Sequence, residues 1–145
     1  MKHRLSFGFY NIFANNVVEV TADEGIEMTL EMVEECHLFM NKHIKGDFAL
    51  LINRINNYSY TYEAQLSLAS YSGLKALAFV CYSKESFLVT EKLQSNRSFD
   101  QWQHPVFAGL ELGWQQAYQW LENELLKIKK CRQVSKLSMV FQLKI

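Results

Sequence analysis

Phe48-Ala49-Leu50-Leu51-Ile52 is an almost uninterrupted apolar run, and a second run of the same kind follows at Leu74–Cys81 (LKALAFVC). Short apolar runs without alternation are typical of strands buried on both faces of a sheet. Between them, residues 62–72 are predicted to form a helix that Gly73 ends. Strands that alternate with helices indicate parallel pairing through right-handed crossovers. The central part of the chain is therefore predicted to be an α/β fold.

The segments that precede this centre predict an antiparallel hairpin and a helix. Leu5, Phe7 and Phe9 alternate with other residues at a period of two, which predicts a strand. A second strand is expected at 17–20, and Asn15-Asn16 between them is a turn signal because Asn tolerates the left-handed conformation. Thr29 is then expected to cap a helix that reaches Gly46.

The segments that follow continue the alternation. Ser83 is expected to cap a helix that runs to about residue 93, and a polar loop is expected over 94–104. A short strand is predicted at 105–108, followed by the longest helix at 113–130. The fold class is thus α/β: a single-domain mixed sheet of about five strands, with an antiparallel hairpin first and parallel β-α units after it.

The C-terminal residues have a different pattern. Apolar residues occupy every odd position, at Leu137, Met139, Phe141, Leu143 and Ile145. This two-residue period predicts a further strand. The sequence therefore divides into a domain over 1–130 and an extension over 131–145, which we expect to add to a sheet edge of its own domain or of a second copy. A homodimer formed by strand exchange is the expected assembly.

Composition excludes several classes of protein. The chain has 145 residues, 49% of them hydrophobic, which fits one domain with a packed core. Lys and Arg together number 15, as do Asp and Glu, so the net charge is zero and we expect no nucleic-acid partner. No apolar run is long enough for a membrane span. Three widely spaced cysteines and the lack of a secretory signal predict a cytoplasmic protein.

The residues that could carry chemistry do not form a recognisable site. Glu34 and His37 have the Glu-x-x-His spacing of di-iron bundles, but those bundles need a second copy and two further glutamates. Cys36 and His43 share a helical stripe without the second ligand pair that zinc requires. No nucleophile motif or glycine-rich phosphate loop occurs. We therefore expect no enzymatic activity, no catalytic residue, no metal and no cofactor.

The loop after the central strand contains the candidate binding residues Asn53, Tyr58, Ser59 and Tyr60. One interpretation is a recognition or modification loop with exposed tyrosines, because Tyr is favoured at recognition surfaces. The other is a plain helix cap with the Tyr rings packed over the edge of the sheet. The basic run from Lys127 to Lys136 has two interpretations as well: contact with an anionic surface, or complementation of the dipole of its own helix.

Three segments, taken in order, resemble the SpoIIAA-like branch of the STAS superfamily, the domains related to bacterial anti-sigma-factor antagonists. They are VVEVTADEGIEMTLEMVEE at 17–35, FALLINR at 48–54 and PVFAGLELGWQQAYQWL at 105–121. The resemblance spans about residues 5–126 and implies a mixed sheet with helices mostly on one face. In the antagonists, a kinase phosphorylates a serine in an Asp-Ser-x-Gly context after the central strand. Here Asn53 replaces the usual Asp, and Ser59 lies near that place without the motif.

The resemblance implies a non-catalytic regulatory module that binds another protein, whose identity the sequence does not give. The alternative is a binding protein for a small apolar ligand, because ten Phe, seven Tyr and three Trp could line a pocket between the sheet and the helices.

Overall fold

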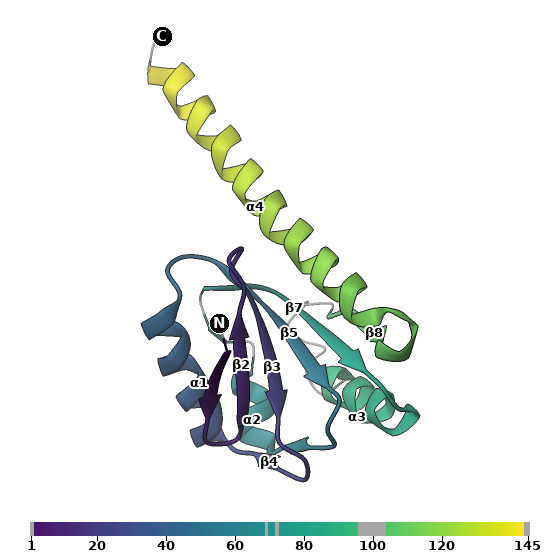
Figure 1. The fold of residues 1–145 in the computed structure, drawn as a ribbon. Coiled ribbons are helices and arrows are strands. Elements are labelled where there is room, and N and C mark those ends of the chain that lie inside the picture. The colour runs from purple at the N-terminus through teal and green to yellow at the C-terminus, as the bar shows by residue number, and fades with distance from the viewer. Residues whose placement is uncertain (1, 69, 72, 96–103, 144–145) are drawn as a thin grey trace.

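The computed structural model describes residues 2–68, 70–71, 73–95 and 104–143. Its main sheet has six strands in the order β1-β2-β3-β5-β7-β8 (Figure 1). These strands are β1 (Lys2–Leu5), β2 (Gly8–Ile12), β3 (Val17–Ala22), β5 (Phe48–Arg54), β7 (Leu74–Cys81) and β8 (Val106–Ala108). β1, β2 and β3 pair antiparallel with one another, and β3, β5, β7 and β8 pair in parallel, so the hairpin precedes parallel units as the sequence predicted. Most of the polar loop expected over 94–104 lies outside the described residues.

The N-terminal segment forms one strand more than the sequence indicated. The alternating residues after Met1 divide at Ser6 and Phe7 into two strands, so β1 and β2 form a tight hairpin before the predicted one. Gly8 is required there, because a Cβ would lie 2.2 Å from the carbonyl oxygen of Thr21 on β3. Asn16 has φ 66°, which confirms the left-handed turn expected between β2 and β3.

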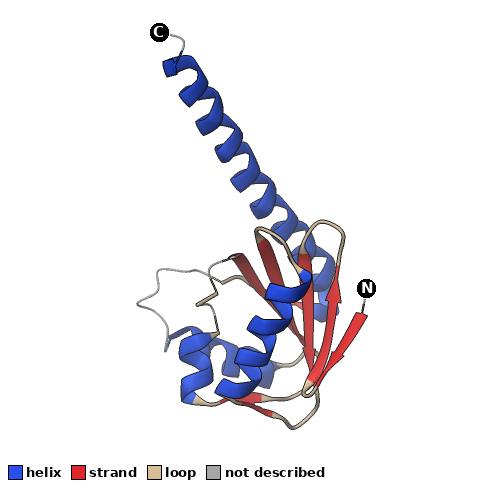
Figure 2. Ribbon diagram, turned by 90° about the vertical axis from the view of Figure 1, so that its left-hand side faces the viewer, coloured by secondary structure: helices blue, strands red, loops and turns tan. Residues whose placement is uncertain are grey.

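Helices cover both faces of the sheet, three on one side and one on the other (Figure 2). The first group is α1 (Leu30–His43), α2 (Tyr62–Ser67) and α3 (Lys84–Ser95). The strand order rises steadily from β3 to β8, so right-handed crossovers place all three connecting helices on the same face. The opposite face is left for α4 (Gly113–Leu143), which follows the last strand.

The buried central strand divides its side chains between these two layers. Phe48, Leu50 and Ile52 of β5 pack with α1 and α2, whereas Ala49 and Leu51 pack with α4. Successive side chains of a strand point to opposite faces, so a strand covered on both sides has no polar positions in its middle. This accounts for the uninterrupted apolar run in the sequence.

Hydroxyl side chains cap three helices: the caps at Thr29 and Ser83 were predicted, and Thr61 precedes the helix predicted to begin at residue 62. Thr29 Oγ1 accepts from the Met32 amide of α1 at 3.4 Å, and Ser83 Oγ accepts from the Ser86 amide of α3 at 3.1 Å. Thr61 caps α2, which ends at Ser67 and is shorter than expected. Before α2, the chain forms a small parallel sheet of β4 (Glu27–Met28) and β6 (Ser59–Tyr60), where the sequence indicated only loop.

The C-terminal strand predicted from the alternating residues is wrong. Residues 137–143 continue α4, which is helical from Gly113 to Leu143 and projects away from the sheet (Figure 1). Extending an existing helix adds one hydrogen bond per residue fixed, whereas a new strand must first find an edge. Four of the seven residues of this segment are Leu, Met or Gln, which are good helix formers. An exchanged strand therefore has no structural basis up to Leu143, and residues 144–145 lie outside the described part.

Candidate functional site

The four predicted binding residues lie on different faces of the sheet. Asn53 faces α4, where its Nδ2 donates to Glu19 Oε2 at 3.0 Å. The same carboxylate oxygen accepts from Trp114 Nε1 at 2.7 Å. These bonds connect β3, β5 and the first turn of α4. Asn53 therefore contributes to the attachment of α4, and its Oδ1 also accepts from the Ile55 amide at the start of the loop that follows β5.

Tyr58 and Tyr60 are buried, with 7% and 9% of their surfaces exposed. The expectation of exposed recognition tyrosines is therefore wrong. Because β6 pairs with β4, alternate side chains point into the core and Ser59 between them faces solvent. The two tyrosine hydroxyls are hydrogen-bonded at 3.0 Å, and burial raises the pKa of both phenols.

Arg54, the last residue of β5, lies against this pair of tyrosines. Only 3% of its surface is exposed. Its guanidinium carbon lies 4.4 Å from the centre of the Tyr58 ring and 5.6 Å from that of Tyr60. Its Nη2 donates to the Tyr58 carbonyl oxygen at 2.8 Å. The sequence analysis missed Arg54; the available signal was an arginine that ends an apolar strand, a place where a charge is costly to bury.

The charge of Arg54 has no anionic partner in the described part of the chain. No ion pair reaches it, and its Nε and Nη1 make no hydrogen bond. Ser86 Oγ, in the first turn of α3, is also buried without a partner. Buried charges are normally paired, and buried polar atoms are normally hydrogen-bonded. The three unpartnered atoms therefore need an explanation.

Both residues border a pocket of about 290 Å³ at the carboxyl ends of the parallel strands. Three loops form it: the β3–β4 turn, the β5–β6 loop and the start of α3. The lining residues are Gly25, Ile26, Arg54, Asn57, Tyr58, Ser59, Glu85, Ser86 and Val89. In open α/β sheets, ligands bind in the crevice beyond the carboxyl ends of the strands. This pocket is the candidate functional site.

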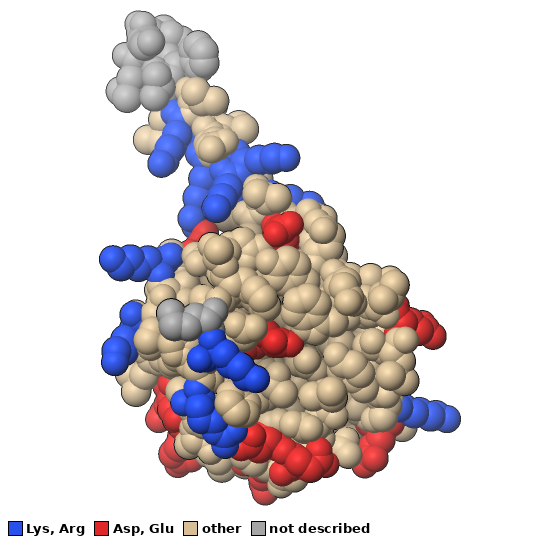
Figure 3. Space-filling view, viewed as in Figure 1, with Lys and Arg blue, Asp and Glu red and all other residues tan. Residues whose placement is uncertain are grey.

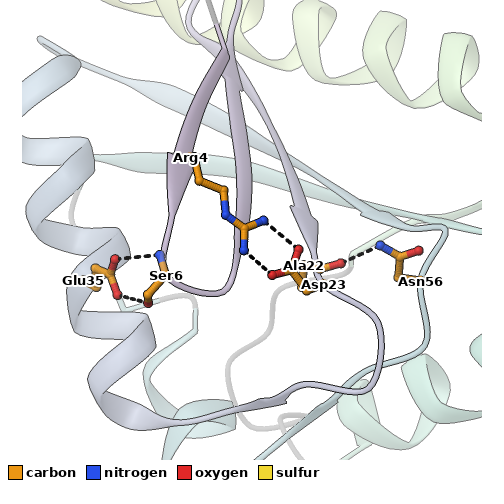
Figure 4. A network of polar contacts seen from close by, with 6 residues as sticks. All are labelled: Arg4, Ser6, Ala22, Asp23, Glu35 and Asn56. Carbon is orange, nitrogen blue, oxygen red and sulfur yellow. Dashed lines mark hydrogen bonds and ion pairs between the residues drawn. The ribbon is translucent and has the colours of Figure 1, made fainter.

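Hydrogen bonds hold the loops of the pocket together. The Gly25 amide donates to the Asn57 carbonyl at 2.6 Å, and the Asn57 amide donates to Glu24 Oε2 at 2.8 Å. Gly25 has φ +74°, a conformation that favours glycine. Asn56 Nδ2 donates to the carbonyl of Ala22 at the end of β3 (Figure 4). The two loops are thus bonded to each other, and the Asn56 side chain bonds them to the end of β3.

The same network fixes the N-terminal hairpin beside these loops (Figure 4). Arg4 donates from two nitrogens to the Asp23 carboxylate, at 2.7 and 2.5 Å. This contact lowers the pKa of Asp23. Ser6 donates from its amide and hydroxyl to Glu35 of α1. The hairpin is therefore tied to α1 on one side and to the end of β3 on the other.

A second, apolar cavity lies between the sheet and α1, in the place expected for a lipophilic ligand. Its volume is about 30 Å³, and Tyr10, Met40, Ile52, Tyr60 and Leu68 are among the residues that line it. That is about the volume one water molecule occupies in the liquid, whereas small-molecule pockets have about 300–1,000 Å³.

Cys36 lies beside this cavity and contacts the Tyr10 hydroxyl through its Sγ. Burial raises the pKa of the Cys36 thiol to about 12, so the thiol is protonated at neutral pH. A protonated thiol is a poor nucleophile and a poor metal ligand. Within the described residues, no group of three His, Cys, Asp or Glu side chains is placed to hold a metal ion.

Charge is distributed unevenly over the surface (Figure 3). Basic side chains gather on the projecting part of α4, which carries Lys127, Lys129, Lys130, Arg132 and Lys136. Acidic side chains gather at the opposite end, where β3 leads through Asp23 and Glu24 into β4. The pocket that Arg54 borders lies at this acidic end, because Gly25 and Ile26 of its lining directly follow Asp23 and Glu24.

No model of a known family matches the chain, no curated protein matches it, and no solved structure matches its fold. The resemblance to STAS domains therefore stays a prediction. None of the helices in the described ranges combines the length and apolar character needed to cross a membrane.

Proposed function

We propose that the chain is a non-catalytic interaction module of the STAS type that binds a partner protein through the projecting end of α4. The observation that carries this proposal is the exposure of that end. Every residue from 131 to 139 is exposed, including Val134 at 64% and Leu137 at 60%. Arg132 pairs with Asp47 at 2.6 Å, and among the residues that the structure describes no later residue of α4 has an ion pair to the domain.

Three exposed apolar residues of α4 lie within about 80° of one another around the helix axis, whereas Met139, 63% exposed, lies on the other side. Leu126, Val134 and Leu137 are 46%, 64% and 60% exposed. At about 100° per residue, Leu126 and Leu137 fall nearly opposite Ala117 and Leu121, which are buried against the sheet, and Val134 lies beside them on the flank of the helix. Short isolated helices are marginal in water, so packing against another surface would stabilise this one. An apolar stripe on a helix is the feature that binds in the groove of a partner.

Charge favours a partner of opposite sign. Five basic residues lie on α4 from Lys127 onward, and no acidic residue follows Glu124 in the sequence. Two such helices packed side by side would bring like charges together. We therefore propose a partner protein with an apolar groove rimmed by acidic residues, and a second copy of this chain is an outcome that the experiment below distinguishes.

The test is capture of partners from a nuclease-treated lysate by the full chain and by variants. Leu137→Glu adds a charge to the stripe, and Leu110→Glu adds the same charge at a position 82% exposed on the domain. We expect one protein to be retained by the wild type and by Leu110→Glu and lost with Leu137→Glu. The captured protein, once purified, should bind the chain directly by calorimetry.

Three results would overturn this proposal. The first is a captured protein that Leu137→Glu still retains. The second is a binding partner that disappears on nuclease treatment, since it would be a nucleic acid. The third is light scattering that shows a dimer in the wild type and a monomer with Leu137→Glu, since the stripe would then bind a second copy.

The alternative proposal, a carrier of a small lipophilic molecule, is supported by the position of the apolar cavity and opposed by its volume. A ligand would have to open the space between α1 and the sheet beyond about 30 Å³. Native mass spectrometry of the purified chain would detect a bound molecule, and its absence would remove this alternative.

A further inference from the structure

We infer that the pocket bordered by Arg54 and Ser86 binds the carboxylate group of a small, otherwise apolar acid. The inference does not depend on the partner of α4, because the pocket is formed by the β3–β4 turn, the β5–β6 loop and α3. It also concerns a different space from the apolar cavity beside α1, with which it shares no lining residue.

The first step is the unpaired charge. Arg54 is 3% exposed, and within the described chain its guanidinium lies over two tyrosine rings and donates to one carbonyl oxygen. The ring faces and the carbonyl stabilise the cation in part. They leave Nε and Nη1 without acceptors, although a guanidinium presents five N–H donors. An anion at this place would supply the missing acceptors and the opposite charge.

The second step is the independent donor on the other wall. Ser86 is 5% exposed, and its Oγ has no partner. It lies in the first turn of α3, a helix of 12 residues whose N-terminus carries the positive end of the dipole. The Ser83 cap bonds to the Ser86 amide, not to its hydroxyl, so this buried hydroxyl is left without a partner. Two unpartnered buried groups from different elements thus border the same pocket.

The third step is the class of anion. Glu85 lines the pocket, and the Glu24 carboxylate is held at its edge by the Asn57 amide. With one buried cation and two carboxylates nearby, a singly charged group is favoured over a doubly charged phosphate. Carboxylates also match the planar donors of arginine.

The fourth step is the rest of the ligand. Ile26 and Val89 supply apolar surface to the pocket, and Val89 is 40% exposed. A volume of about 290 Å³ holds on the order of ten water-sized groups. The ligand is therefore a small carboxylic acid with an aliphatic or aromatic body, and the β3–β4 turn and α3 contact that body.

The experiment is a titration of the full chain, labelled with ¹⁵N, followed by NMR. The probes are benzoate, its neutral analogue benzamide and phenyl phosphate. We expect benzoate to shift the amides of Asn57, Ser59 and Ser86 and the Arg54 Nε–H in a saturable way. Hydrogen bonds to a charged group are strong enough that benzamide should bind about tenfold more weakly or worse. Phenyl phosphate should bind more weakly than benzoate.

Variants test the residues. Arg54→Met should weaken benzoate binding about tenfold or more, and Ser86→Ala should weaken it by a smaller factor. Lys42→Met removes a positive charge from an exposed position of α1 and should leave binding unchanged. Val89→Trp fills the pocket from its exposed side, so it should abolish binding with Arg54 in place, which keeps the test valid if Arg54→Met does not fold.

Each contrary result overturns the inference. Benzoate shifts that are equal in the wild type and in Val89→Trp would place binding elsewhere. Tighter binding of phenyl phosphate than of benzoate would assign the pocket to phosphate groups. No shift with any probe would make Arg54 a purely structural cation held by Tyr58 and Tyr60.

Discussion

The same substitution made at two leucines of α4 should have very different effects. Leu121 and Leu137 lie on one helix and differ in their surroundings: Leu121 is fully buried against the sheet, and Leu137 is 60% exposed beyond it. Replacing each by Ala changes the same atoms and keeps a good helix former. The pair therefore isolates the contribution of tertiary packing from that of the helix itself.

The expected size follows from what surrounds each side chain. Leu121 packs in a layer that contains Ala49, Ala76 and Ala78, whose short side chains cannot move into the space that the substitution leaves. Leu121→Ala should therefore fall in the upper part of the usual range, about 3–5 kcal/mol of unfolding free energy. Leu137→Ala should change it by no more than about 0.5 kcal/mol, as exposed substitutions do.

Urea unfolding followed by far-UV circular dichroism measures both values, and thermal unfolding gives a second readout. For a chain of this length, about 3–4 °C per kcal/mol is expected, so Leu121→Ala should lower the Tm by about 10–20 °C. Each variant is measured at two protein concentrations about a hundredfold apart, because the stability of a dimer depends on concentration.

A large loss of unfolding free energy in Leu137→Ala, the variant at the exposed position, would refute this reasoning. If Leu137→Ala destabilised the chain as much as Leu121→Ala at both concentrations, the C-terminal segment would pack on its own domain, as the predicted strand would. If the loss of unfolding free energy in Leu137→Ala were larger at the higher protein concentration, the segment would pack on a second copy. In either case α4 would not end in a free helix.

Three further predictions follow from the described contacts. Burial raises the pKa of Cys36 to about 12 and that of Tyr10 well above its ordinary value, so the folded chain keeps protons that the unfolded chain releases. The Tm should therefore be steady below about pH 9 and fall between about pH 9 and 12, and it should fall less in Cys36→Ala. A Tm that does not change with pH over this range would contradict this prediction. Gly25→Ala should cost about 1 kcal/mol by urea unfolding, because φ is +74° with no atom within 4 Å of the added Cβ, and a stabilised variant would disprove the strained turn. Thr61→Ala should cost about 1 kcal/mol by removing the acceptor of the Ala64 amide, while Thr61→Ser keeps it, and equal losses in both would show that the cap contributes nothing.

The candidate site was only partly predictable. The sequence directed attention to the loop after β5, and Tyr58 and Ser59 do line the pocket there. It did not identify Arg54 or Ser86, because a buried, unpaired group is defined by neighbours from three loops far apart in the chain. It also grouped Asn53 with this loop, although adjacent residues of a strand point to opposite faces and Asn53 bonds to Glu19 on the α4 side.

By itself, the sequence determined the α/β class, the order of the central elements, the caps at Thr29 and Ser83, and the strands buried on both faces. These features depend on local chemistry: the period of apolar residues, hydroxyls at helix starts, and Asn or Gly where φ is positive. Tertiary structure decided the extra strand β1, the inward direction of Tyr58 and Tyr60, and the helical state of the C-terminal segment. An alternating apolar segment becomes a strand only where a sheet edge is available to it, and here the preceding helix continues through that segment instead.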